Sequence, residues 1–212
     1  MQITIIGTGN MARGIATRAL AGGNSVTLLG TTADKAQALA GDLSGDVRAA
    51  AIGDPISGDV VVLAVWYQAL DDVVGRYAGQ LDGKVVVDIT NPLDVDAFEP
   101  IVPEAGSAAQ EVADAAPNAK VVKAFNTLNW TKMVDPQSSG GPVSIPIVGD
   151  DAAARATVAE LVKGMGLEPV DLGPLRFANT LEEMLVIWAN ARGHGAAYNY
   201  YLRPEPASAP AR

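Results

Sequence analysis

The sequence predicts a doubly wound α/β fold with a mainly parallel sheet and a small C-terminal extension that ends in a long helix. Short apolar runs, several of them continuous rather than alternating, recur along the 212 residues. Such runs are typical of strands buried on both faces of a parallel sheet. Alanine-rich stretches of helical length separate them, and this alternation indicates βαβ units. Because the first run leads straight into a glycine-rich turn and a helix, the fold is predicted to be of the Rossmann type.

Each expected element follows from its own pattern. Strands are expected where Val, Ile and Leu cluster, at residues 3–6, 26–29, 60–65, 85–89, 121–125, 143–148 and 167–172. Helices are expected at residues 11–21, 33–43, 69–81, 108–115 and 151–165. The last and longest helix is expected at about residues 177–201. Leu181, Met184, Leu185 and Trp188 recur there at the spacing of one helix face.

Three parts of the chain are expected. Residues 1–149 form the dinucleotide-binding Rossmann domain, and residues 150–203 form a C-terminal part for substrate binding or dimerisation. Residues 204–212 are rich in proline and alanine, which predicts a disordered tail. The serine- and glycine-rich loop at residues 135–142 is expected to be a flexible connection that could act as a lid.

Composition limits the partners. The net charge of −9 argues against nucleic acid and against an anionic membrane surface, since both attract a positive protein. The chain has no cysteine, which excludes disulfides, thiolate catalysis and cysteine-ligated metals. No signal peptide pattern begins the sequence, and the apolar run at residues 60–67 is too short to cross a bilayer. A cytoplasmic protein without a metal site and with a small-molecule partner is therefore expected.

The segment Gly7-Thr8-Gly9-Asn10-Met11-Ala12 joins the first strand to the first helix. Gly7 permits the sharp turn, Gly9 has no side chain to block a pyrophosphate, and Ala12 lets the helix pack closely on the strand. The free N–H groups and the dipole of the helix start would hold phosphates even in an acidic protein. All six residues are predicted to bind a nicotinamide dinucleotide. The alternative is a glycine turn that binds nothing.

The end of the second strand predicts which dinucleotide is bound. An NAD site usually places an acidic residue there to bond the ribose 2′-hydroxyl, but this chain has Gly30, Thr31 and Thr32, with Lys35 one helical turn later. Without a carboxylate to repel it, a 2′-phosphate could accept hydrogen bonds from Thr31, Thr32 and Lys35. The pattern favours NADP over NAD. The alternative role of the threonines is to cap the next helix.

Segments along nearly the whole chain resemble the coenzyme F420-dependent NADP oxidoreductase family. The similarity is carried by Gly7-Thr8-Gly9-Asn10-Met11-Ala12, Gly30-Thr31-Thr32, Val87-Asp88-Ile89-Thr90-Asn91-Pro92-Leu93 and Val122-Lys123-Ala124-Phe125-Asn126-Thr127, with further matches at Val148-Gly149-Asp150-Asp151, Asp171-Leu172-Gly173-Pro174-Leu175 and Leu181-Glu182. The resemblance implies hydride transfer between NADPH and a deazaflavin, F420, as co-substrate. It also implies catalysis by juxtaposing the two rings and excluding water, so no side chain is assigned as catalytic.

The sequence departs from the family pattern at three places. Thr32 and Ala33 replace arginines that are typical of the family, Trp66 stands where many members have proline, and Asn126 stands where archaeal members tend to have histidine. Two alternatives therefore stay open. One is an NAD(P)H-dependent reductase of a flavin, a quinone or a small carbonyl or imine. The other is a non-catalytic NAD(P)-binding sensor module.

The remaining candidates follow later strands, at the carboxyl edge where open α/β sheets bind ligands. Further cofactor contacts are predicted at Ala64, Val65, Trp66, Tyr67, Thr90, Asn91 and Pro92. For these the alternatives are core packing of the tryptophan and a plain turn after the next strand. Asn126 and Thr127 are predicted to contact the second substrate. Phe125 is expected in the core, and Lys123 on the opposite face of its strand from Ala124.

The C-terminal part offers weaker candidates. His194 is expected to be an exposed or capping residue rather than an acid or base, and Arg176 and Arg192 are expected to be solvated. The aromatic residues of the last segment are predicted to form a core or dimer face, which suggests a homodimer; they are Trp188, Tyr198, Tyr200 and Tyr201.

Overall fold

The computed structural model describes residues 1–94, 97, 99–135 and 143–195. The predicted tail, all of the expected lid except Asp135, and the three C-terminal tyrosines lie outside these residues, as does the side chain of Trp188. None of the described helices is both long and apolar enough to cross a membrane. A cytoplasmic location stays a prediction.

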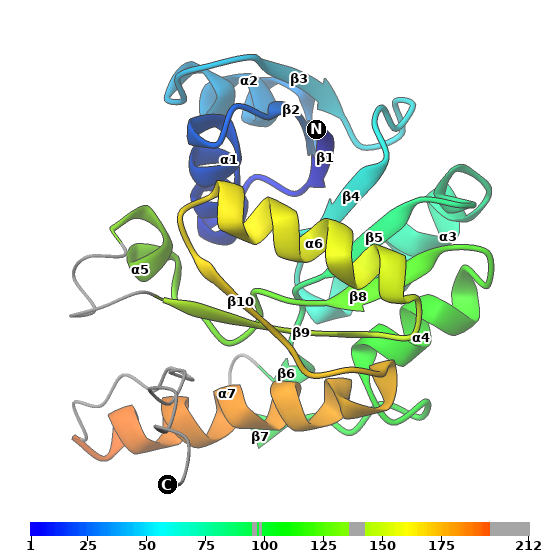
Figure 1. Ribbon diagram of the computed structural model, residues 1–212, viewed down its shortest axis with the longest axis vertical. Helices are drawn as coiled ribbons and strands as arrows, with labels where there is room; N and C mark the ends of the chain where they lie inside the picture. The colour runs from blue at the N-terminus through cyan, green and yellow to red at the C-terminus, as the bar shows by residue number, and fades with distance from the viewer. Residues whose placement is uncertain (95–96, 98, 136–142, 196–212) are drawn as a thin grey trace, which may run out of the picture.

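An eight-stranded sheet forms the centre of the molecule, in the order β3-β2-β1-β4-β5-β8-β9-β10 (Figure 1). Neighbouring strands are parallel except β8 and β9. The strands are β1 (Gln2–Ile6), β2 (Ser25–Gly30), β3 (Val47–Ala51), β4 (Val60–Leu63), β5 (Val85–Asp88), β8 (Lys120–Lys123), β9 (Ser144–Gly149) and β10 (Glu168–Asp171). A separate antiparallel pair joins β6 (Leu93–Asp94) to β7 (Glu99–Pro100).

Helices cover both faces of this sheet. They are α1 (Asn10–Ala21), α2 (Ala33–Gly41), α3 (Leu70–Leu81), α4 (Ala108–Ala115), α5 (Trp130–Val134), α6 (Ala152–Gly164) and α7 (Ala178–Gly193), with short 3-10 turns η1 (Tyr67–Ala69) and η3 (Leu175–Phe177). Helix α7 packs against α4, β7 and β9, along the end of the molecule where β6 and β7 lie (Figure 1).

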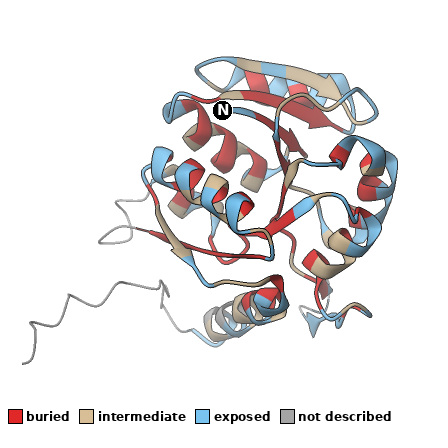
Figure 2. Cartoon of the chain, turned by 45° about the vertical axis from the view of Figure 1, so that its right-hand side comes forward, coloured by how far each residue is buried: buried red, intermediate tan, exposed pale blue. Residues whose placement is uncertain are grey.

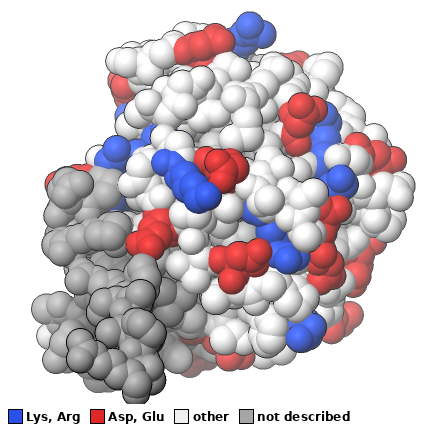
Figure 3. All heavy atoms as spheres, viewed as in Figure 1, with Lys and Arg blue, Asp and Glu red and all other residues white. Residues whose placement is uncertain are grey.

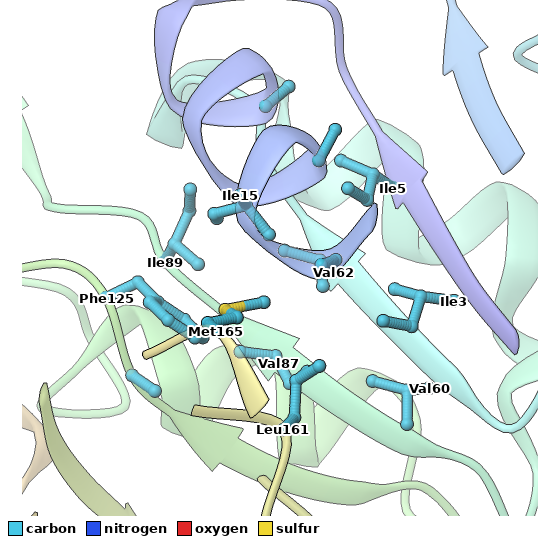
Figure 4. Packing of buried hydrophobic residues seen from close by; sticks show 14 of the residues in the cluster. Ile3, Ile5, Ile15, Val60, Val62, Val87, Ile89, Phe125, Leu161 and Met165 are labelled. Carbon is cyan, nitrogen blue, oxygen red and sulfur yellow. The ribbon is translucent and has the colours of Figure 1, made fainter. Parts of the chain in front are cut away.

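The core has two halves because successive strand residues point to opposite faces. On β1, Ile3 and Ile5 join the cluster under α1, α2 and α6, whereas Ile6 joins the cluster under α3 and α4. Figure 4 shows the first cluster, in which Ile15 of α1 and Leu161 of α6 approach the sheet from the same side. The central strands are buried through most of their length, the edge strands β3 and β10 are mostly half-buried, and exposed residues lie mainly on the outer helix faces and in loops (Figure 2).

The structure confirms the predicted fold class, including the C-terminal helix. Three features of the structure have no counterpart in the predictions. The edge strand β3 is built largely from alanine and is mostly half-buried, so it has no apolar run to mark it. The β6–β7 pair and α5 are very short. The division at residue 149 stays a prediction, since the sheet continues past that residue into β10.

Candidate functional site

The predicted site residues follow strands at the carboxyl edge of the sheet. Strand β1 pairs with β2 on one side and with β4 on the other, so the chain order reverses between β1 and β4. The N–H of Gly7 donates to Leu29 O at 2.8 Å and that of Ala64 to Ile6 O at 2.8 Å, so the ends of β1, β2 and β4 are held side by side. This reversal point is where open α/β sheets bind ligands.

Gly7 and Gly9, in the turn between β1 and α1, have different roles. Gly7 has φ +125°, and a Cβ built on it would lie 2.1 Å from Ala64 O. It is therefore required by the packing of β1 against β4. Gly9 is the N-cap of α1, with φ −77°, and a Cβ there would meet no described atom within 4 Å. Folding does not require Gly9 to lack a side chain, so its role points to a molecule outside the chain.

The start of α1 suits an anion. No side chain caps its first turn and none in that turn is acidic, all of these residues being described. Asn10 is exposed, Thr8 and Met11 are half-buried, and Ala12 is fully buried against the sheet. Unused helix N–H groups together with the dipole bind phosphate groups. The residues present therefore fit the pyrophosphate of a dinucleotide, although the individual contacts predicted for Gly7 to Ala12 remain a prediction.

The end of β2 has no room for an acidic side chain at Gly30. A Cβ there would lie 2.7 Å from Thr32 O and 3.1 Å from the Thr8 methyl group. Thr31, Thr32 and Lys35 are exposed. Thr32 Oγ1 accepts a hydrogen bond from Lys35 N at 3.3 Å, so this threonine caps α2 as the alternative interpretation predicts. The exposed side chains of Thr31 and Lys35 stay available for a 2′-phosphate.

The segment after β4 leaves the sheet edge quickly, because the strand ends at Leu63 rather than at residue 65. Ala64 and Val65 are half-buried, and Trp66 is 73% exposed, so it is not a core residue. Tyr67 turns towards α4, where its hydroxyl donates to Glu111 Oε1 at 3.3 Å. Burial and this carboxylate raise the pKa of Tyr67 to about 12. The tyrosine lines a cavity of about 380 Å³ between α3 and α4.

The ends of β5 and β8 are joined by a pair of asparagines. Asn91 Nδ2 donates to Asn126 O at 3.1 Å, and Asn126 Nδ2 donates to Asn91 Oδ1 at 2.9 Å. Asn126 Nδ2 also donates to Leu181 O of α7 at 2.9 Å. Thr90, Pro92 and Thr127 are buried beside them. Thr90 Oγ1 and Asn126 Oδ1 are buried without a hydrogen-bond partner among the described residues, which is the kind of group that calls for a ligand or another explanation.

Phe125 lies between these loops in an unusual conformation. Its φ of 62° is the only positive value among the described non-glycine residues. The side chain is fully buried and points into the core cluster, as predicted (Figure 4). Backbone strain of this kind costs about 1–3 kcal/mol and is concentrated at functional sites. Here it turns the chain sharply, so that Asn126 follows at the sheet edge.

A buried ion cluster lies directly beneath the asparagines. Lys123 Nζ contacts Asp88 Oδ2 at 2.8 Å and Glu182 Oε1 at 2.6 Å, and it donates to Thr90 O at 2.5 Å. Lys123 and Asp88 are 0% exposed and Glu182 is 5% exposed. Burial raises the pKa of Glu182, while the Lys123 ammonium acts in the opposite direction. As alternation predicts, Lys123 points away from the face of Ala124, towards α7.

The other charged candidates are peripheral. His194 is exposed, and its Nδ1 lies 3.0 Å from Asn190 O, a terminal helix contact as expected. Arg176 is exposed and lies over the Phe177 ring at 4.7 Å; the Arg192 side chain lies outside the described residues. Both signs of charge are interspersed over the face in Figure 3, without a broad basic patch. Among the described residues, no group of three or more His, Asp or Glu side chains could hold a metal ion.

Comparison with known proteins identifies the family. The sequence profile of "NADP oxidoreductase coenzyme F420-dependent" matches residues 2–92. A solved structure from Arthrobacter sp. FB24, a "putative f420 dependent nadp-reductase", is 31% identical, with a TM-score of 0.83. That alignment covers 95% of this chain and 99% of the other. The chain belongs to the F420-dependent NADP oxidoreductase family. The predicted resemblance is thereby confirmed, and with it an enzyme of the NADP-dependent oxidoreductase class.

Other relatives of this family member differ in length. The F420-dependent NADP reductase of Methanocaldococcus jannaschii is 28% identical over 200 residues, covering 86% of this chain and 88% of that protein. Metalloreductase STEAP3 of Rattus norvegicus is 30% identical over 183 residues, which is 85% of this chain. The chain spans only 36% of the length of STEAP3.

Two further functional candidates are Asp88 and Glu182. Both lie in segments that resemble the family, but the sequence pattern alone does not single them out. A signal for Asp88 is present: it ends an apolar strand and stands opposite Lys123 in the β5–β8 register. Two opposite charges at the ends of adjacent buried strands predict an ion pair. Glu182 carries no comparable signal, because only the path of α7 brings it to Lys123.

Proposed function

We propose that this protein is an NADP-dependent oxidoreductase that transfers hydride between NADPH and a deazaflavin acceptor of the F420 type. The observation that carries the proposal is Gly9. It begins α1 at the reversal point of the sheet, and the space that its side chain would fill is free of described protein atoms. A backbone left bare at a helix start is what a pyrophosphate needs. Family membership supplies the class of reaction.

The residues of this chain would bind and orient the dinucleotide and the acceptor, and none of them would react covalently. The α1 N-terminus would hold the pyrophosphate, and Thr31 with Lys35 would hold the 2′-phosphate. The reduced nicotinamide supplies the hydride. Asn91 and Asn126, fixed to each other by hydrogen bonds, would position the reacting rings, and the apolar surroundings of residues 64–65 would limit water. Holding two reactants in register accounts for most of the rate enhancement in such a reaction.

The test of this function is NADPH oxidation with a panel of acceptors. We expect loss of NADPH absorbance coupled to loss of F420 absorbance, with little turnover on free flavins, quinones, carbonyls or imines. Tight NADPH binding without turnover on any acceptor would contradict a catalytic role and favour the sensor.

A second candidate is reduction of a flavin, with a metal ion as the final substrate. The similarity to metalloreductase STEAP3 favours it, since it extends over 85% of this chain. In the acceptor panel, this candidate predicts faster NADPH oxidation with flavin plus ferric chelate than with F420.

The NADP preference yields a prediction at Thr31. A Thr31→Asp substitution puts a carboxylate beside the 2′-phosphate, and because Thr31 is exposed the fold is not disturbed. A charge-assisted hydrogen bond contributes about 1.5–3 kcal/mol, so we expect NADPH to bind about 10- to 100-fold more weakly. NADH affinity should stay level or rise. Fluorescence titration with both dinucleotides measures this, and an equal loss for NADH would contradict the 2′-phosphate site.

We also infer a homodimer formed through α7. Ile187 on α7 is 66% exposed and Phe177 in η3 is 42% exposed. Val102, which is 83% exposed, follows the β7 strand that packs against α7. These three side chains lie on or beside α7, η3 and β7, which pack together, and an apolar surface shared by these elements would be covered by a partner.

Ile187→Lys tests the dimer. The added ammonium would have to be buried without a counter-charge in the pairing surface, so the mass measured by light scattering should shift from dimer to monomer. The matched control is Gln37→Lys on the exposed face of α2, which adds the same charge away from α7 and should leave the mass unchanged. A monomeric wild-type chain at micromolar concentration would contradict the dimer.

A further inference from the structure

The ammonium of Lys123 is fully engaged. Its three contacts are Asp88 Oδ2, Thr90 O and Glu182 Oε1, at 2.8, 2.5 and 2.6 Å. An ammonium has three N–H donors, so each is used, and the side chain is 0% exposed. Lys123 is therefore placed to hold other groups and not to meet a substrate.

The cluster fixes the backbone of Thr90 from both sides. Lys123 binds its carbonyl oxygen, and Asp88 Oδ1 accepts from its N–H at 2.9 Å. On the far side, Glu182 accepts from Ala108 N at 3.2 Å, at the start of α4. A carboxylate is favourable at a helix N-terminus. One carboxylate thus ties α7 to both the sheet and α4.

The two residues next to the cluster hold Asn126. Asn91 follows Thr90, Leu181 precedes Glu182, and both supply acceptors to Asn126 Nδ2, at 2.9 Å each. With Nδ2 occupied by two oxygens, the orientation of the amide is set. Its Oδ1 is buried and has no hydrogen-bond partner among the described residues, so it could accept from the N–H group of a ligand that enters beside it.

We propose that Lys123 and Glu182 are positioning residues, through which α7 sets the orientation of Asn126. That orientation in turn aligns the ligand ring whose N–H group would donate to Asn126 Oδ1. The proposal rests on the proposed reductase function, because that function supplies the reacting rings. The ion cluster contacts neither ring and acts through Thr90, Asn91 and Leu181.

Glu182→Gln tests the proposal, with Glu183→Gln as its matched control. Glu183 is the next residue of α7 and is exposed. We expect Glu182→Gln to bind NADPH within about twofold of wild type, because the phosphate loop lies elsewhere on the sheet edge. Its kcat should fall about 10- to 100-fold, as expected for misaligned reactants. The emission of bound NADPH should move towards that of free NADPH. Glu183→Gln should match wild type in all three measurements.

If folded Glu182→Gln keeps the wild-type kcat and the wild-type emission of bound NADPH, the proposal is overturned. An equal fall of kcat in Glu183→Gln would overturn it as well. If thermal melting shows that Glu182→Gln is unfolded, Glu182→Asp replaces it, since this change keeps the buried charge and only shortens the side chain that contacts Lys123 and the start of α4. The same split between Kd and kcat is then expected, and its absence overturns the proposal. A wild-type protein that binds NADPH but reduces no acceptor contradicts the proposed function instead. The emission comparison then still decides the role of Glu182.

Discussion

A Gly9→Val variant is expected to keep its fold and lose its dinucleotide. The valine side chain would enter space that is free of described protein atoms, at an ordinary φ of −77°, so the stability loss should be limited to about 1 kcal/mol for a poorer N-cap. The same side chain would block the backbone N–H groups of the α1 start. Losing two charge-assisted hydrogen bonds of about 1.5–3 kcal/mol each weakens NADPH binding by at least about 100-fold. Fluorescence titration and thermal melting measure the two effects.

Two further glycine substitutions show whether the loss is local. Gly79→Val in α3 also places a valine in open space, so NADPH should bind it as it binds wild type. Gly7→Ala should lose both fold and binding, because its Cβ would lie 2.1 Å from Ala64 O at φ +125°. If Gly9→Val retains wild-type affinity, the turn between β1 and α1 is a structural bend and the proposed function fails with it.

Local rules are sufficient to predict part of the site from the sequence. A glycine turn between a buried strand and a helix has one geometry, so Gly7 and Gly9 can be assigned from their spacing. The β5 and β8 edge can be located because consecutive apolar runs form neighbouring parallel strands. Phe125 lies in the core as its apolar strand predicts, but its positive φ has no signal in the sequence.

The parts of the site that the sequence does not predict depend on contacts between residues far apart in the chain. Asn126 and Leu181 are 55 positions apart, and nothing in either local segment indicates that they share a hydrogen bond. The contact of Tyr67 with the cofactor stays a prediction, and nothing in the local sequence indicates that its hydroxyl donates to Glu111, 44 positions away in α4. Long-range packing of α4 and α7 decides these positions, and periodicity along one segment does not encode it.

Lys123→Met is expected to cause the largest loss of stability. Removing the ammonium leaves Asp88 and Glu182 buried together without a counter-charge, and breaking a buried pair in this way costs about 3–5 kcal/mol. Urea unfolding near neutral pH measures it. The matched control is Lys120→Met at the other end of β8, whose side chain is 43% exposed and whose ammonium lies 3.7 Å from Asp151 Oδ2. Its loss should stay below about 1 kcal/mol.

The pH dependence of this loss has a definite sign. Burial raises the pKa of Glu182, and Lys123 opposes that rise, so the pKa should rise further in Lys123→Met. For an acid whose pKa is raised in the folded state, stability is greatest below the unfolded pKa and is lost as the pH rises through the folded pKa. The stability deficit of Lys123→Met should therefore shrink as the pH falls from about 7 to about 5.

The neutral combination Asp88→Asn, Lys123→Met and Glu182→Gln should recover much of the stability near neutral pH, because uncharged residues avoid the desolvation penalty. A deficit that grows as the pH falls would show that the lost ammonium was not compensating buried carboxylates.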